Sequence, residues 1–327
     1  MTGAGILVTV PFGPEPDWRT DCDATSYNSG KGDKFVKALC REIEQRTPSF
    51  RGTTFTTACF AGAGPSCLSL DQLYRILQTL YNSIESDLVE QTFVVLPGAV
   101  DEGRAKVLCE SGFDRVELRI TDPDRSSNDF RILRAAGFPT VGLELPYSSD
   151  AREWERRLDA LLRLEPDHAT FHLSGKYDEL ALLAVLRRTR ERLGAAGYES
   201  WALHHYARPG KESRFLAGIA AGAVLAGFGP GAPTFAGNEA TANRVDFNGY
   251  VGKAGKGESA SQPCAREFVM RWQLAGASGI AADRAEPGAA REFVERGLLE
   301  RRASRLFVTD QGVIAFDRIV RALAKSA

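Results

Sequence analysis

From residue 5 to residue 210, short apolar runs alternate with longer amphipathic stretches. The apolar runs have the length of buried strands, and the amphipathic stretches repeat apolar residues every three to four positions, as helices do. The pattern predicts strands over residues 6–10, 53–60, 92–96, 115–120, 140–145, 168–173 and 200–204. It predicts helices over residues 33–46, 69–85, 101–111, 151–164 and 177–194, with a short helix that ends at residues 136–137.

The alternation of strand and helix is typical of parallel βαβ units. Helices that end at Gly112, Gly137 and Gly197, each followed by an aromatic residue and a strand, repeat one stop signal. At least six such units predict an α/β fold, a partial (β/α)6 TIM-like barrel over residues 1–210. In barrels of this kind the functional residues lie at the C-terminal ends of the strands.

After residue 210 the pattern changes, and residues 211–327 are expected to form a separate C-terminal domain with a Gly/Lys/Ser-rich linker at about 249–263. Predicted helices at 264–274, 289–296 and 311–324 and a hairpin at 298–308 indicate a small helical, winged-helix-like domain. The uncharged stretch 215–236 is broken by Pro230 and Pro233. A bilayer needs about 20 apolar residues, so we expect this stretch to be buried backbone under or beside the barrel.

The composition excludes several functional classes. Lys and Arg total 41 against 42 Asp and Glu, and 43% of residues are hydrophobic, as in an ordinary soluble protein. The balance disfavours a nucleic-acid partner, and no apolar segment indicates a membrane partner. No targeting segment is expected before Arg19, so the predicted location is the cytoplasm. The predicted partner is a small-molecule substrate. The oligomeric state stays open.

The cysteines do not form a recognisable framework. Six in 327 residues, without CxxC spacing, disfavour both a disulfide scaffold and a structural zinc site, and no metal ligands are predicted. Walker, GxGxxG, HExxH and GxSxG motifs are also missing from the sequence.

An ordered set of short motifs resembles the radical S-adenosylmethionine (SAM) superfamily, in particular the oxygen-independent coproporphyrinogen dehydrogenases and their heme-chaperone relatives. The matching pieces cover nearly the whole chain: Val10-Pro-Phe12, Ala61-Gly-Ala-Gly-Pro-Ser66, Pro97-Gly98, Gly112-Phe-Asp-Arg-Val116, Leu133-Arg-Ala-Ala-Gly-Phe138, Pro166-Asp-His168, Gly197-Tyr-Glu199, Tyr206-Ala-Arg-Pro-Gly210, Glu212-Ser-Arg214, Gly229-Pro-Gly-Ala232 and Phe293-Val-Glu-Arg-Gly-Leu-Leu-Glu300. The resemblance implies a partial (β/α)6 barrel of the radical SAM type.

The loop after Phe12 departs from that family. The family binds a [4Fe-4S] cluster through CxxxCxxC at this place, whereas residues 13–23 contain only Cys22. One thiolate cannot replace the three that the cluster takes from the protein. We therefore expect no iron-sulfur cluster and no reductive cleavage of SAM.

The resemblance implies that a SAM site is only partly kept. Gly62, Ala63, Gly64 and Pro65 match the family's glycine motif, Thr121 stands for its glutamine, and Glu144 for its fifth-strand aspartate. Apolar residues, Val94 and Leu96, replace polar ones on the third strand. The helix that brings an arginine to the SAM carboxylate is shortened, which leaves Arg119, Arg131 or Arg134 as substitutes.

All four histidines fall on the last strands of the predicted barrel. His168 begins its strand and is expected to be structural, whereas His172 lies near the end of that strand and His204 and His205 end the next one. An imidazole at a strand end can act as a general base near neutral pH. His172, His204, His205 and Glu144 are therefore the predicted catalytic residues. Aromatic side chains, Tyr147, Trp201 and Tyr206, could wall a planar ligand, and Glu117 is expected to pair with an arginine.

Several functions remain open. The first is an enzyme, a transferase or cyclase, that uses SAM without radicals, because the SAM sulfonium is already activated for heterolytic attack. The alternative is a heme or tetrapyrrole binder with His172, His204 and His205 as axial-ligand candidates. A barrel enzyme that does not use SAM, and a noncatalytic partner of a radical enzyme, are two further hypotheses.

Overall fold

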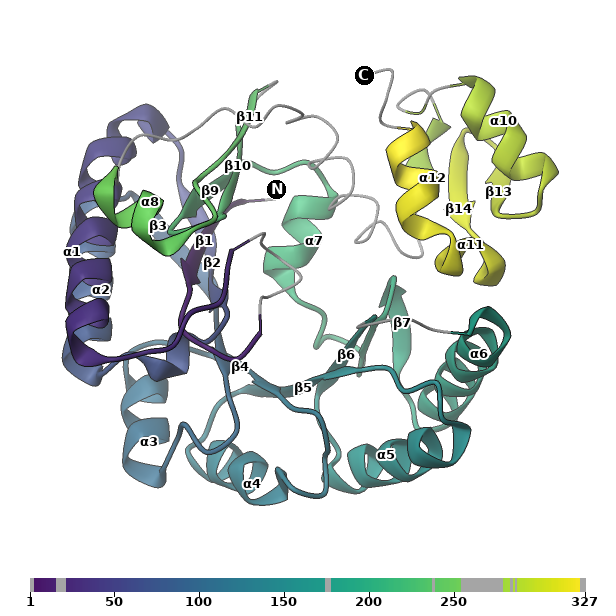
Figure 1. Ribbon diagram of the computed structural model, residues 1–327, viewed down its shortest axis with the longest axis horizontal. Coiled ribbons are helices and arrows are strands. Elements are labelled where there is room, and N and C mark those ends of the chain that lie inside the picture. Colours follow the sequence, from purple (N-terminus) through teal and green to yellow (C-terminus); the bar gives the residue numbers. More distant parts are fainter. Residues whose placement is uncertain are drawn as a thin grey trace. The chain divides into compact units, whose positions relative to one another are not determined.

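The computed structural model describes residues 3–15, 22–173, 178–236, 239–253, 279–282, 285 and 287–323. The chain divides into two compact units. Unit 1 comprises Met1–Arg119, Asn128–Val141 and Ser213–Pro263, and unit 2 comprises Ile120–Ser127, Gly142–Glu212 and Cys264–Ala327. Both units contain strands alternating with helices (Figure 1), which confirms the predicted α/β class.

A parallel sheet forms the centre of unit 1. It contains β1 (Ala4–Val10), β2 (Phe55–Gly62), β3 (Ser86–Val95) and β4 (Arg115–Arg119), in that order. Every residue of β1 is buried. Strands covered on both faces appear in a sequence as unbroken apolar runs, which is why the pattern located them. β3 begins before the predicted residue 92, because its first half is polar and exposed and gives no apolar signal.

Three capped helices connect these strands: α1 (Ser29–Arg46), α2 (Leu70–Ser83) and α3 (Glu102–Glu110), and α4 (Ser127–Ala135) follows β4 (Figure 1). The predicted capping box is confirmed, because the Ser69 hydroxyl accepts from the Gln72 backbone N–H while the Gln72 side chain accepts from the Ser69 N–H. α1 begins earlier than predicted, at a cap in which Asn28 Oδ1 accepts from the Lys31 N–H.

The segment after residue 213 also belongs to unit 1. It forms α7 (Arg214–Ala220), β9 (Leu225–Phe228), β10 (Pro233–Ala236), β11 (Glu239–Ala242) and α8 (Phe247–Gly252). β9 pairs in parallel with β1, so the expectation that residues 215–236 form buried backbone beside the barrel is confirmed. The division into units therefore differs from the domain boundary expected after residue 210, because this backbone completes its hydrogen bonds on β1.

A buried carboxylate ties this segment to α1. Glu42, 1% exposed, accepts hydrogen bonds from Arg46 Nη1 at 2.6 Å, Asn243 Nδ2 at 2.7 Å, the Gly229 backbone N–H at 2.9 Å and the Tyr250 hydroxyl at 2.6 Å. Burial, and then the neighbouring Glu42 charge, raise the pKa of Tyr250 well above its usual value, so the phenol stays protonated and donates. One side chain thus joins α1, the turn after β9, the residue after β11 and α8.

The first part of unit 2 continues the alternation. β5 (Thr140–Pro146) pairs in parallel with β6 (His168–His172), and α5 (Ala151–Leu164) packs against α6 (Glu179–Ala195). Trp154 of α5 donates to the Thr189 hydroxyl of α6 at 2.8 Å in the core between the helices. On the solvent side Arg192 binds both Glu155 and Asp159.

The strand predicted at residues 200–204 is wrong in its form. The chain makes a hairpin of β7 (Glu199–Ala202) and β8 (His205–Ala207), and β8 pairs antiparallel with β6. Leu203 and His204 form the turn, in which His204 has a left-handed backbone with φ of 64°. The pattern missed this turn because neither residue is a usual turn-former.

The described residues from 279 to 323 form a small domain of an antiparallel sheet and helices in unit 2 (Figure 1): β12 (Ile280–Ala281), α10 (Pro287–Glu295), β13 (Leu299–Arg302), β14 (Arg305–Val308), α11 (Asp310–Ile314) and α12 (Phe316–Leu323). The predicted hairpin at 298–308 is confirmed, and the predicted last helix is interrupted at Ala315. Phe293, Leu306, Ile319 and Leu323 are part of its own hydrophobic core. The helix predicted at 264–274 lies outside the described residues.

The small domain contacts α6 within unit 2. Asp310 of α11 binds Arg190 of α6 at 2.7 Å and Arg187 at 3.6 Å. Among the described helices, none combines the length and the apolar character that a membrane crossing requires.

Replacing Glu42 by Gln should lower the free energy of unfolding by about 2–4 kcal/mol, because a new N–H₂ group would face buried donors and Arg46 would lose its counter-ion. Urea denaturation measures this loss. The matched control is Glu44→Gln, on an exposed site of the same helix, which should change stability by less than about 0.5 kcal/mol. Equal effects of the two variants would contradict the role of the Glu42 network.

Candidate functional site

The glycine turn after β2 is closely packed against β1. Gly62 has a left-handed φ of 99°, and a Cβ atom on it would lie 2.5 Å from the Val10 carbonyl oxygen. A Cβ on Gly64 would lie 2.6 Å from the Phe12 carbonyl oxygen. Both glycines are therefore required by neighbouring backbone, whether or not a ligand approaches the turn.

The loop that follows β1 folds back on itself beside this turn. Thr25 donates its N–H to the Pro11 carbonyl and accepts from the Gly13 N–H, and Phe12 forms a bridge with Thr25. Cys22 is fully buried, with its Sγ 3.4 Å from the Asp23 carbonyl oxygen. Residues 16–21, outside the described part of the loop, contain no further cysteine. The thiols of this loop therefore do not fit a [4Fe-4S] cluster, although its absence stays a prediction.

Arg119 is the arginine that reaches the glycine turn. Its Nη1 donates to the Gly62 carbonyl oxygen at 3.0 Å from the end of β4. Arg134, by contrast, lies over the Phe130 ring of its own helix. The predicted partner of Glu117 is confirmed, because Glu117 Oε1 lies 3.7 Å from Nε of buried Arg115.

Unit 2 brings Glu144 and His172 together. Pro146 pairs with His172 and Glu144 with Thr170 in the β5–β6 register, so the two side chains sit at the C-terminal ends of neighbouring strands. His172 Nδ1 lies 3.9 Å from Glu144 Oε1, and the carboxylate is 1% exposed whereas the imidazole is 21% exposed. A buried carboxylate therefore lies on the Nδ1 side of a partly exposed imidazole.

His204 joins this pair from the hairpin turn. Its carbonyl accepts from the Phe171 N–H at 2.9 Å, and its Nδ1 lies 3.1 Å from the Tyr147 hydroxyl. Burial, and then the nearby His172, lower the pKa of His204 to about 4. At neutral pH this imidazole is therefore uncharged, and Nε2 is the ring nitrogen not taken by Tyr147.

The remaining histidines have packing roles. His205 is buried, and its Nδ1 is 3.1 Å from the hydroxyl of Thr170, its partner in the β6–β8 register, so it lies on the same face of the sheet as Glu144 and His172. The His168 ring covers Gly142, where any Cβ atom would overlap the imidazole. Sequence alternation alone could not decide between His204 and His205, because the hairpin places them on a turn and a strand.

Tyr147 and Arg157 have roles in the structure that no local sequence pattern predicts. Buried Tyr147 stacks on Phe171 at 5.2 Å between ring centroids, and its N–H donates to the His172 carbonyl. Arg157 of α5 donates to the Pro146 carbonyl and binds Glu153 at 2.7 Å. These contacts fix the loop after β5, but their only sequence signal is an aromatic residue that follows a strand. Tyr206 also packs on Phe171, while Trp201 is half-buried against His205.

The residues expected to form one pocket divide between the units. Gly62–Pro65 belongs to unit 1, whereas Thr121, Glu144 and His172 belong to unit 2. Thr121 is exposed. Their union in a single SAM site stays a prediction. Within the described residues, no three His, Cys, Asp or Glu side chains gather as a ligand set for a metal ion, and the five described cysteines are not in disulfides.

No protein-family model matches the chain. The heme chaperone HemW of Mycobacterium tuberculosis is 24% identical over 362 residues, which cover 92% of this chain and 90% of that protein. The oxygen-independent coproporphyrinogen III oxidase of Pseudomonas aeruginosa is 24% identical over 245 residues, or 63% of this chain. That match spans 53%, about half, of the oxidase.

The solved structure of coproporphyrinogen III oxidase (HemN) from Escherichia coli, described as a radical SAM enzyme, matches with a TM-score of 0.77 at 18% identity. The match covers 99% of this chain and 91% of that one. The chain therefore has the radical SAM fold and is related to the coproporphyrinogen III oxidases and heme chaperones.

Gly62→Ala should destabilise unit 1 by more than about 2 kcal/mol, because a methyl group would collide with β1 backbone as well as strain a left-handed residue. Gly98→Ala is the matched control: Gly98 also has positive φ, 70°, but nothing lies within 4 Å of its Cβ position. It should cost about 1–2 kcal/mol. Chemical denaturation compares the two, and equal losses would contradict the packing role of Gly62.

Proposed function

We propose that this chain binds heme, or a closely related metal tetrapyrrole, as its cargo, and that His172 and His204 are its iron ligands. The observation that carries the proposal is the presence of two imidazoles that influence each other electrostatically, His172 at the end of β6 and His204 in the turn between β7 and β8, the second of which has a pKa of about 4. Iron is bound by neutral imidazole, so a ring that does not take up a proton near neutral pH is suited to ligate it.

A hydrogen bond orients the His204 ring, and a carboxylate lies near the His172 ring at 3.9 Å. The Tyr147 hydroxyl holds Nδ1 of His204, and the Glu144 carboxylate lies behind Nδ1 of His172. A group hydrogen-bonded to the second ring nitrogen, as Tyr147 is to His204, fixes the orientation of a ligating histidine. Both rings would then offer Nε2 to the iron. Leu173, next to His172, is 40% exposed, an apolar surface that a porphyrin face could cover.

The relatives support this proposal more than an enzymatic one. The sequence match to the heme chaperone covers 92% of this chain and 90% of that protein, whereas the sequence match to the oxidase covers 53% of that enzyme. The fold does not separate the two, because the solved oxidase structure matches 99% of this chain. The loop after β1 offers one buried thiol, which does not fit the cluster chemistry of a radical enzyme. Cargo binding does not depend on a cluster.

Nonradical use of SAM stays a second hypothesis. Its motivation is the glycine turn, with Arg119 beside it. The structure gives both glycines a packing reason that does not involve a ligand. The turn is therefore weaker support for SAM than the sequence suggested, and calorimetry with SAM on the metal-free protein tests it separately.

Titration of ferric hemin with the protein should show saturable binding and a six-coordinate low-spin spectrum. His172→Ala and His204→Ala should each weaken binding at least about tenfold, because each removes an iron ligand. His205→Gln is the control, since that ring is bonded to Thr170. Loss of the low-spin spectrum only with His205→Gln, or no binding by the parent, would refute the proposal.

The same titration has an expected pH dependence. With a pKa of about 4 instead of the usual 6.5, His204 stays roughly nine-tenths neutral at pH 5. The pKa is lowered, and not raised, because burial disfavours the protonated, charged ring. In the His172→Ala variant burial, the larger cause of the lowered pKa, remains while the His172 contribution is lost, so hemin binding by this variant should persist from pH 7 to about pH 6. A loss of binding between pH 7 and pH 6 would contradict His204 as the remaining ligand.

Anaerobic reconstitution with iron and sulfide should leave less than about one iron per chain, because only Cys22 is present in the loop after β1. Cys22→Ala should give the same iron content as the parent. About four irons per chain, lost in Cys22→Ala, would show that a cluster forms and would reopen radical chemistry.

A further inference from the structure

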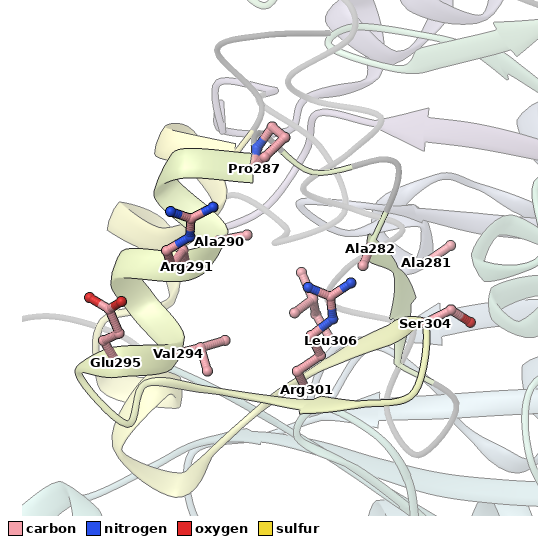
Figure 2. Close-up of a pocket in the computed structure, with 10 residues that line it drawn as sticks. All are labelled: Ala281, Ala282, Pro287, Ala290, Arg291, Val294, Glu295, Arg301, Ser304 and Leu306. Carbon is pink, nitrogen blue, oxygen red and sulfur yellow. The ribbon is translucent and has the colours of Figure 1, made fainter.

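The small C-terminal domain contains a cavity of its own. It has a volume of about 690 Å³ and lies between α10, β12 and the β13–β14 hairpin (Figure 2). This volume is within the range of small-molecule sites in proteins. No histidine lines it, so it is distinct from the proposed iron ligands.

The cavity has an apolar lining with cationic side chains above it. Small apolar residues form the walls: Ala281, Ala282, Pro287, Ala290, Val294 and Leu306. Figure 2 shows Arg301 extending from the hairpin into the space between α10 and β12, while Arg291 stands on the α10 wall. The Glu295 carboxylate extends from α10 on the side away from β12.

These two arginines differ from their neighbours. Arg296 binds Glu292 at 2.9 Å, and Arg302 binds Glu300 at 2.7 Å. Among the described residues, neither Arg291 nor Arg301 has an acidic partner within ion-pair distance, and Arg301 makes only a long contact of 3.4 Å to the Ala303 carbonyl. Guanidinium groups bind carboxylates through two parallel hydrogen bonds.

We propose that this cavity binds a small carboxylate with an apolar body. Arg301 and Arg291 would bind the carboxylate group, and the apolar lining residues, Ala281 and Leu306 among them, would contact the apolar body. The combination of cationic groups and an apolar lining favours carboxylates that carry an apolar body. A fully polar anion would leave the alanine side chains of the walls uncovered. A neutral apolar molecule would leave the two guanidinium groups without an anionic partner. The inference is independent of heme binding.

Calorimetric titration of the full chain with 2-naphthoate, and with uncharged 2-naphthamide, tests the proposal. The carboxylate should bind at least tenfold more tightly than the amide, and Arg301→Ala should weaken carboxylate binding about tenfold, equivalent to about 1.4 kcal/mol. Arg302→Ala is the matched control on the adjacent position, because that side chain is paired with Glu300.

Unchanged affinity in Arg302→Ala together with weakened affinity in Arg301→Ala supports the site. Three results would overturn the proposal. They are an equal loss of affinity in both variants, equal affinity for the acid and the amide, and the absence of saturable heat up to about 5 mM carboxylate, which corresponds to very weak, millimolar binding. Because hemin binding is measured separately and depends on His172 and His204, failure here leaves that proposal unaffected.

Discussion

Unit 1 depends on the burial of one acidic side chain with four donors. An isolated carboxylate in a protein interior is strongly unfavourable, and Glu42 is tolerated because Arg46, Asn243, Gly229 and Tyr250 all donate to it. Three of these donors come from residues 229–250, far along the chain. Burial of Glu42 on α1 is therefore favourable only when the segment after β9 is in place to donate these hydrogen bonds.

Much of this fold follows from the sequence, since buried parallel strands and capped helices carry strong local signals. The Ser69–Gln72 capping box is an example. The hairpin at Leu203–His204 could not be predicted, because its left-handed residue is a histidine with no glycine or asparagine to signal a turn. The place of β9 depends on pairing with β1, a contact between distant parts of the sequence that no local pattern reports.

The candidate site was predicted unevenly for the same reason. Strand-end logic brought His172 and Glu144 together. The position of a residue at a strand end could not show how the environments of His204 and His205 differ, because that difference depends on the β7–β8 hairpin. Nor could it predict the contact of the Tyr147 hydroxyl with His204, which depends on the loop after β5. The glycine turn was located correctly, but its tight packing on Val10 and Phe12 is visible only in three dimensions.

The hairpin also affects how the chain behaves toward other copies of itself. A further parallel strand would leave a regular row of backbone donors and acceptors at the end of the unit 2 sheet, open to pairing with another chain. β7 is only four residues long, begins with charged Glu199, and loses its regular register between Ser200 and Ala202. Such a short, irregular strand is a poor template for intermolecular pairing, so the turn at His204 makes this edge of the sheet unfavourable for edge-to-edge association.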